Sequence, residues 1–226
     1  MRARMDFPFL DIVFFAMLAI FLGLRLRSVL GRRTGLEKRR PDPFKPAEAE
    51  PVKAPDNVLR LPERDRKVLE GLGEADTPLA RGLRSIKQAD PRFDEVAFIG
   101  GGRAAFDMIV TAFARGDVAA LRPLLADQVF DNFKRAIDER ISRGETLETT
   151  LVAIASAELV DAELDGSVAK LTVRFVSEQV NVTKAAYGKV VDGDPNRVVT
   201  ITDIWIFARD TRSSDPNWML VETRSP

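Results

Sequence analysis

The chain has 226 residues, of which 45% are apolar and 30% are charged, and its 34 Lys and Arg residues balance its 34 Asp and Glu residues. This composition suits one compact domain with a linker. The sequence contains no Cys and no His, which excludes disulfides, thiol catalysis, Cys/His zinc sites and His-dependent triads. We therefore predict that the protein is not an enzyme and has no catalytic residue, metal ligand or cofactor.

Charge is distributed unevenly along the chain. Nine Lys and Arg residues, but three Asp and Glu residues, lie between Met1 and Arg40, so the remainder carries a net negative charge. A basic segment beside a hydrophobic run favours an anionic lipid surface as its partner. The acidic remainder argues against non-specific binding to nucleic acid.

An apolar segment extends from Phe7 to Leu24, and its one charged residue is Asp11. As a helix it has nearly the length of a hydrocarbon core of about 30 Å. Most of the neighbouring basic residues follow it, which places the N-terminus outside and the rest of the chain in the cytoplasm. No A-x-A-like cleavage site follows, so we predict a single-pass anchor over residues 1–30 rather than a cleaved signal peptide.

A proline-rich stretch with many charged residues predicts an extended stalk over residues 31–76. The basic side chains around its start either bind anionic lipid or only set the orientation of the anchor. These candidate lipid contacts are Arg25, Arg27, Arg32, Arg33, Arg39 and Arg40.

Thr77 and Pro78 open a predicted amphipathic helix over residues 77–89. Its apolar face carries Leu79, Leu83 and Ile86. Its other face is a basic stripe of Arg81, Arg84 and Lys87, which either lies on anionic lipid or is simply solvated.

Residues 90–226 are predicted to form the globular domain, and its first part is helical. Helical spacing of apolar residues precedes Gly116, and Asp117 and Asp127 are each placed to cap a following helix. The inward side of the last helix is predicted to carry Val129, Phe130, Phe133, Ile137 and Ile141. The run Gly100-Gly101-Gly102 is interpreted as a hinge between helices or, together with Arg103, as a cradle for a lipid phosphate.

From Leu147 the apolar period becomes alternating, which predicts four antiparallel strands. They run approximately over 151–164, 168–183, 197–209 and 218–223. A change of parity predicts a bulge or bend near Ser177 to Gln179. The predicted fold class is α+β, with helices on the concave side of a strongly curved four-stranded sheet, as in a cone that encloses a pocket.

Aromatic and apolar side chains of this sheet either line such a pocket or form plain core. The candidate lining residues are Phe106 from the helical part and Phe175, Ile201, Asp203, Trp205, Phe207 and Trp218 from the sheet. Asp203 alternates with Ile201 and Trp205, so its carboxyl group either serves as a proton-abstracting base, or pairs with a cross-strand cation such as Arg174, or faces solvent.

Four segments carry a family resemblance: FIGGGRAAFDMIVTAFARGDVAALRPLL, VRFVSEQV, DIWIFARD and DPNWMLVET. They resemble the Tim44-like domain family over Asp90 to Thr223. That family includes the motor-tethering subunit of the mitochondrial inner-membrane translocase and its bacterial TimA-type relatives. The resemblance implies an NTF2-like, or cystatin-like, fold, attachment to anionic lipid such as cardiolipin, and a scaffold role in protein transport.

We therefore expect a non-enzymatic adaptor at the cytoplasmic face of a bacterial inner membrane, acting in protein translocation or membrane-complex assembly. Its expected partners are the anionic phospholipid membrane and a protein or unfolded polypeptide, for example through chaperone binding. Two alternatives remain open: an NTF2-like small-ligand binder or enzyme that uses Asp203, and an anionic-lipid-binding assembly factor.

Overall fold

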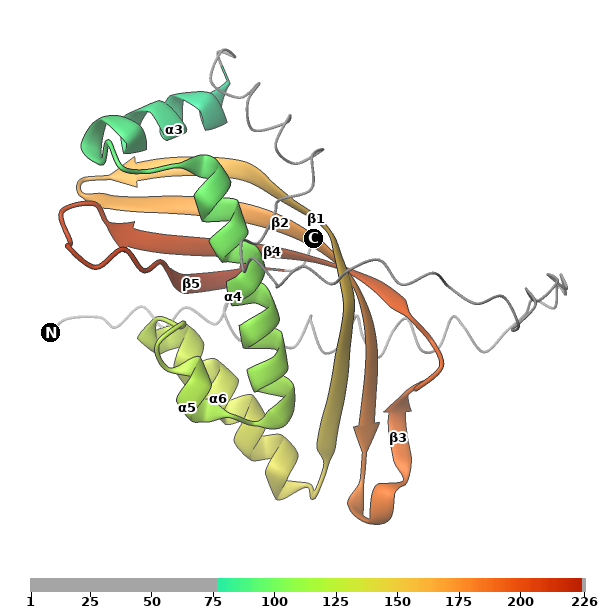
Figure 1. The fold of residues 1–226 in the computed structure, drawn as a ribbon. Helices are drawn as coiled ribbons and strands as arrows, with labels where there is room; N and C mark the ends of the chain where they lie inside the picture. The colour runs from blue at the N-terminus through green and yellow to red at the C-terminus, as the bar shows by residue number, and fades with distance from the viewer. Residues whose placement is uncertain (1–76, 225–226) are drawn as a thin grey trace, which may run out of the picture. The chain divides into compact units, whose positions relative to one another are not determined.

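The computed structural model describes residues 77–224, in which a group of helices precedes a curved antiparallel sheet (Figure 1). The predicted α+β class is confirmed at this level. The anchor predicted over residues 1–30 and the stalk predicted over residues 31–76 lie outside the described residues.

Helix α3 spans Pro78–Ala89 and begins where its sequence predicts. Thr77 is the N-cap, and its side-chain oxygen accepts a hydrogen bond from the backbone N–H of Ala80 at 3.1 Å. Leu83 and Ile86 are buried in the same apolar core as the sheet. The helix therefore docks its apolar face on the domain and leaves its basic stripe exposed.

Helix α4 spans Glu95–Arg115 and continues without interruption through Gly100, Gly101 and Gly102. The predicted hinge at these glycines is therefore wrong, and so is the phosphate cradle, because neither a chain bend nor a helix N-terminus occurs there. Buried apolar residues on both sides of the glycines, among them Ile99 and Phe106, hold the helix on one core. It ends as predicted at Gly116, whose φ of 71° suits glycine.

Helix α5 spans Val118–Leu121, and Asp117 caps it as predicted. Helix α6 spans Asp127–Ser142. Its N-cap is Ala126 rather than Asp127, and Ile141 is 61% exposed, which contradicts its predicted inward position. The inward position in this last turn belongs to Arg140, which donates to the carbonyl oxygens of Phe113 at 2.8 Å and Ala114 at 3.0 Å, at the end of α4.

The sheet has five strands: β1 Thr146–Asp165, β2 Val168–Lys184, β3 Val190–Gly193, β4 Val199–Asp210 and β5 Met219–Arg224. Their order is β1-β2-β4-β5, and β3 pairs with the end of β2. Four of the strands match the predicted ones. The prediction missed β3, which has four residues and follows the short 3-10 helix η1 Ala186–Gly188.

The pairing of β1 with β2 contains three register shifts, and one further shift occurs where β2 pairs with β3 and one where β4 pairs with β5. The pairing of β2 with β4 runs without a shift from Val168 to Gln179. Two of the β1 shifts, between Leu151 and Ala153 and between Ile154 and Ser156, lie opposite Ser177 to Gln179. The predicted irregularity therefore occurs at this place, but the extra residues are in β1, and within β2 the polar Ser177 and Gln179 keep the buried parity of Phe175. Gln179 donates to the Ser177 hydroxyl at 2.8 Å, which satisfies both side chains inside the domain.

Helix α4 crosses one face of the sheet, while α3 contacts β1 and α6 contacts β5 (Figure 1). The face beneath α4 carries Leu171, Val173 and Phe175 of β2, each fully buried. Among the described helices, α4 is long and apolar enough to cross a membrane by length and composition. Its buried residues pack in the core of the domain, which accounts for that apolar character.

Candidate functional site

A hollow of about 460 Å³ lies beside the first half of α4. The loop before α4, the helix itself, the end of β4 and the loop between β4 and β5 together form its walls. The lining residues are Asp90, Arg92, Phe93, Asp94, Ala97, Phe98, Gly101, Gly102, Ala105, Met108, Leu124, Phe207, Arg209, Ser214, Pro216, Asn217 and Trp218.

Aromatic rings form one continuous wall of this hollow. The ring of Phe98 meets Trp218 edge-on at a centroid distance of 4.9 Å and meets Phe207 edge-on at 5.9 Å. Phe93 extends the cluster, since its ring lies 5.9 Å from Trp218. Edge-to-face pairs of this kind fix ring orientation, so the wall is formed before any ligand arrives.

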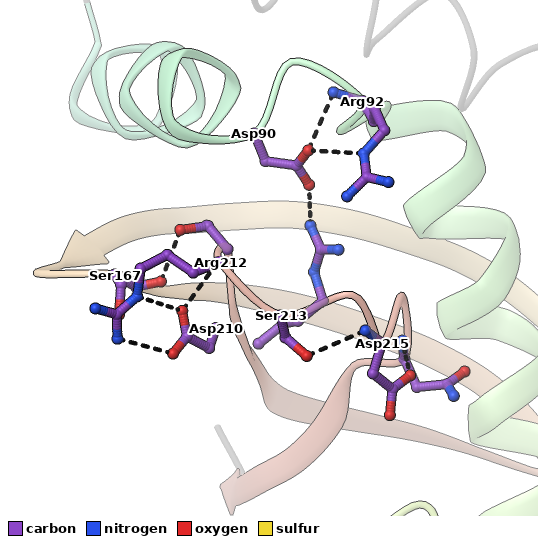
Figure 2. A network of polar contacts seen from close by, with 10 residues as sticks. Asp90, Arg92, Ser167, Asp210, Arg212, Ser213 and Asp215 are labelled. Atoms are coloured by element: carbon purple, nitrogen blue, oxygen red, sulfur yellow. Dashed lines mark hydrogen bonds and ion pairs between the residues drawn. The ribbon is translucent and has the colours of Figure 1, made fainter.

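A buried ion pair between Asp90 and Arg209 forms part of the lining of the hollow, and Figure 2 shows the polar contacts of Asp90. The Asp90 carboxylate accepts hydrogen bonds from the Arg209 guanidinium and, at 3.1 Å, from the backbone N–H of Arg92. The hydrogen bond from Arg209 is the main reason why the pKa of Asp90 is lowered. Arg209 also stacks over the ring of Trp218, 5.1 Å from its centroid.

The loop between β4 and β5 is ordered by its own polar contacts (Figure 2). The backbone N–H of Thr211 donates to the carbonyl of Ser167 at 2.8 Å, and the N–H groups of Asp215 and Asn217 are bound by side chains two residues earlier. Because these contacts hold the loop, those of its residues that line the hollow keep a fixed position.

Three of the sequence-predicted pocket residues pack against one another in the core. The ring of Phe106 lies 4.6 Å from Phe175 and 4.7 Å from Trp205, and all three side chains are buried. Phe207 and Trp218 lie farther along the same aromatic cluster and also line the hollow. The structure thus divides the predicted group between a packed core and the wall of the hollow.

Asp203 lies on the helix-facing side of β4, opposite Phe175 of β2, and Ile201 lies opposite Ser177. Burial raises the pKa of the Asp203 carboxyl to about 6. The predicted pairing with Arg174 is wrong, because Arg174 is opposite Ile204 on the other face and forms an ion pair with Glu158 of β1. Within residues 77–224 the Asp203 carboxyl has no hydrogen bond or ion pair, and no group of three or more acidic side chains is placed to hold a metal.

The basic stripe of α3 is exposed at Arg81, Arg84 and Lys87. Lys87 lies 3.4 Å from the carboxylate of Glu95 at the start of α4. The candidate lipid contacts from Arg25 to Arg40 lie outside the described residues. The grouping of these two basic segments on one membrane surface stays a prediction.

Sequence reasoning missed the two residues of the buried ion pair. Asp90 and Arg209 are 119 positions apart, and nothing local marks them as partners. One signal was available for Arg209. Strand alternation places it on the same side of β4 as Trp205 and Phe207, so its charge was directed toward the helices and required a partner.

Residues 79–225 match the Tim44-like domain family. The chain is 26% identical to the mitochondrial import inner membrane translocase subunit TIM44 of Rattus norvegicus over 176 residues, which cover 74% of this chain and 38% of that protein. It is also 26% identical to the probable translocase subunit tin-44 of Caenorhabditis elegans, over 70% of this chain and 39% of that protein. The chain therefore spans well under half the length of these relatives.

Among solved structures, the intermembrane space region of the chloroplast protein ARC6 is similar, with a TM-score of 0.41 and 12% identity. The similarity covers 60% of this chain and 98% of that chain.

Proposed function

The chain belongs to the Tim44-like domain family, and from this membership we propose that it is a membrane-associated, non-enzymatic adaptor that binds protein partners. The observation that carries this proposal is the family match over residues 79–225, which includes all described helices and strands except the first residue of α3. The relatives are, by name, subunits of a mitochondrial inner-membrane protein translocase. We expect the domain to have the NTF2-like, or cystatin-like, cone that the resemblance implies.

The finer proposal places the adaptor at the cytoplasmic face of a bacterial inner membrane. Residues 1–30 provide the anchor, with the N-terminus outside, and residues 31–76 provide the stalk. The basic residues of the stalk and the exposed stripe of α3 would contact anionic phospholipid such as cardiolipin. The domain would then hold an unfolded polypeptide, a chaperone or a membrane-complex subunit.

Site-specific crosslinking of the full chain in native membranes tests the adaptor function. A photoreactive residue at Met108, which is 50% exposed beside the hollow, should give reproducible protein adducts. The control is the same reactive residue at Val160, which is exposed on β1 away from the hollow. The absence of protein adducts at Met108, together with a co-purifying small molecule, would contradict the adaptor function.

The enzyme or small-ligand alternative rests on Asp203. A desolvated carboxyl group whose pKa is about 6 has the acidity expected of a general base near neutral pH. Saturable binding of a purified small molecule to the protein would favour that alternative if the substitution Asp203→Asn abolished it. The alternative of a lipid-binding assembly factor predicts instead that a chain beginning at Pro55 still floats with anionic liposomes.

A further inference from the structure

We propose that the hollow beside α4 binds one large apolar side chain of a partner polypeptide, while a neighbouring backbone carbonyl of that polypeptide accepts a hydrogen bond from Arg209. This inference rests on the proposed adaptor function and specifies its binding site. It concerns a neutral, extended peptide as the ligand class.

Arg209 has hydrogen-bond donors that the described chain does not use. A guanidinium carries five N–H donors, yet within the described chain this one donates a single hydrogen bond, to Asp90. The side chain is only 8% exposed, and its Nε has no partner within residues 77–224. Leaving the buried Nε unpaired costs free energy, and Arg209 lines the hollow, so an acceptor that a ligand brings to this guanidinium would be stabilising.

The charged residues around the hollow balance one another. Asp90 neutralises Arg209, and the rim adds one further residue of each sign, Arg92 and Asp94. Because the pKa of Asp90 is lowered, this carboxylate stays ionised and the pair stays neutral. A neutral site gains little electrostatic attraction from a charged lipid headgroup, whereas an uncharged amide carbonyl can accept a hydrogen bond from Arg209.

The walls of the hollow leave room for a large apolar side chain. Phe98 and Trp218 present ring surface, and Gly101, one turn after Phe98 on α4, leaves space next to the rings, since a Cβ there would meet nothing within 4 Å. A volume of about 460 Å³ is in the range of small-ligand sites, roughly 300–1,000 Å³. An aromatic or long aliphatic side chain would bury its surface against the rings.

A lipid acyl chain fits the apolar wall but not the polar end. It has no acceptor along its length, so the donors of Arg209 would remain unpaired beside it. A peptide supplies both parts, because each side chain is followed by a carbonyl oxygen.

The test uses the full chain in nanodiscs of phosphatidylcholine and a fluorescent probe, acetyl-Gly-Ser-Phe-Ser-Gly-amide, measured by anisotropy. Gly101→Leu adds an isobutyl group at a residue that lines the hollow; its Cβ would meet nothing within 4 Å, and leucine is a better helix former than glycine, so we expect the fold to be retained. Gly100→Leu is the matched control, because its Cβ also meets nothing within 4 Å but Gly100 does not line the hollow. We expect at least a tenfold loss of probe affinity for Gly101→Leu and no change for Gly100→Leu.

A second probe tests the hydrogen bond. Replacing the Phe carbonyl by a thiocarbonyl weakens the acceptor and leaves the side chain unchanged. We expect affinity to fall several-fold for the full chain. Equal affinity of the two probes, or equal loss in both glycine variants, would overturn the inference.

The outcomes separate this inference from the adaptor function. Probe binding that Gly101→Leu abolishes, without protein adducts in native membranes, supports the site and contradicts the adaptor. Protein adducts that persist in Gly101→Leu, without probe binding, overturn the site and leave the adaptor standing. If Gly101→Leu abolishes retention of a spin-labelled lipid instead of the peptide, the hollow binds lipid and the inference is wrong.

Discussion

At the scale of single residues, Asp203 is a half-buried carboxyl group without a partner among the described residues. It faces the helices in line with Trp205 and opposite Phe175, and burial raises its pKa from 3.8 to about 6. At neutral pH the folded protein must therefore hold a desolvated negative charge. Such a residue lowers the stability of the folded state at neutral pH.

Asp203→Asn should stabilise the domain at neutral pH by up to about 3 kcal/mol, because the amide carries no charge. The folded pKa is raised, so the folded state binds more protons than the unfolded state between pH 4 and 6. The gain should be complete above about pH 6 and disappear as the pH falls toward 4. Urea unfolding at several pH values measures it, and a gain independent of pH would contradict the assignment.

Arg209→Met should destabilise the domain by about 3–5 kcal/mol, because it leaves the buried Asp90 carboxylate unpaired. The pKa of Asp90 is lowered in the folded state, so the stabilisation by this pair is complete above the ordinary pKa of about 4 and is lost as the pH falls through the folded value. The double variant Asp90→Asn with Arg209→Met should lose less than the two single variants together, as measured by urea unfolding. Strict additivity would show that the pair is not coupled.

At the scale of elements, α3 is positioned by a close approach to the sheet. A Cβ added to Gly82 would lie 1.8 Å from the carbonyl oxygen of Ala162 in β1. Only a residue without a side chain allows the helix to lie this close to the strand backbone. The basic stripe of α3 is therefore presented by a fixed element of the domain.

Gly82→Ala should consequently weaken the packing of α3 on β1 and lower the midpoint of thermal unfolding. Gly101→Ala is the control, since it adds the same methyl group to a helix where nothing lies within 4 Å. That variant should instead raise stability by about 0.5–1 kcal/mol. Hydrogen exchange of the α3 amides would locate the effect, and equal stability of the two variants would contradict the close approach.

The elements that could be predicted from the sequence are those with strong local signals. The cap at Thr77, the stop at Gly116 and the alternation in β2 and β4 each appear within a few residues, and the structure confirms them. The glycine run in α4 was misread, and the irregularity near Ser177 and Gln179 was expected in β2 although its extra residues lie in β1, because tertiary packing overrides local propensity there.

The candidate site was less accessible to prediction, because its parts come from distant positions. Phe207 and Trp218 were recognised as aromatic members of the sheet, but the hollow also needs the loop before α4. The pairing of Asp90 with Arg209 depends on the fold as a whole. Local patterns therefore predicted which side chains point inward but not which of them meet.

At the scale of the whole molecule, the proposal combines an anchor, a stalk and a partner-binding domain in one chain. The proposed anchor would be held by burial of its apolar residues in lipid, whereas the proposed stalk would act through charge. Each Lys or Arg near an anionic surface contributes about 1 kcal/mol, and salt screens this attraction. The two contributions should therefore separate when the ionic strength is changed.

A chain that begins at residue 31 keeps the basic residues of the stalk, among them Arg32, Arg33 and Arg39, but lacks the proposed anchor. We expect it to bind vesicles that contain cardiolipin at low salt and to dissociate at about 0.5 M salt, where the screening length is only a few ångström. The full chain should stay in the same vesicles at that salt concentration and during carbonate extraction, because apolar burial is not screened. Flotation assays measure both, with phosphatidylcholine vesicles as the uncharged control. Release of the full chain by carbonate would contradict the anchor, whereas salt-resistant binding of the shortened chain would show that a surface other than the stalk holds the lipid.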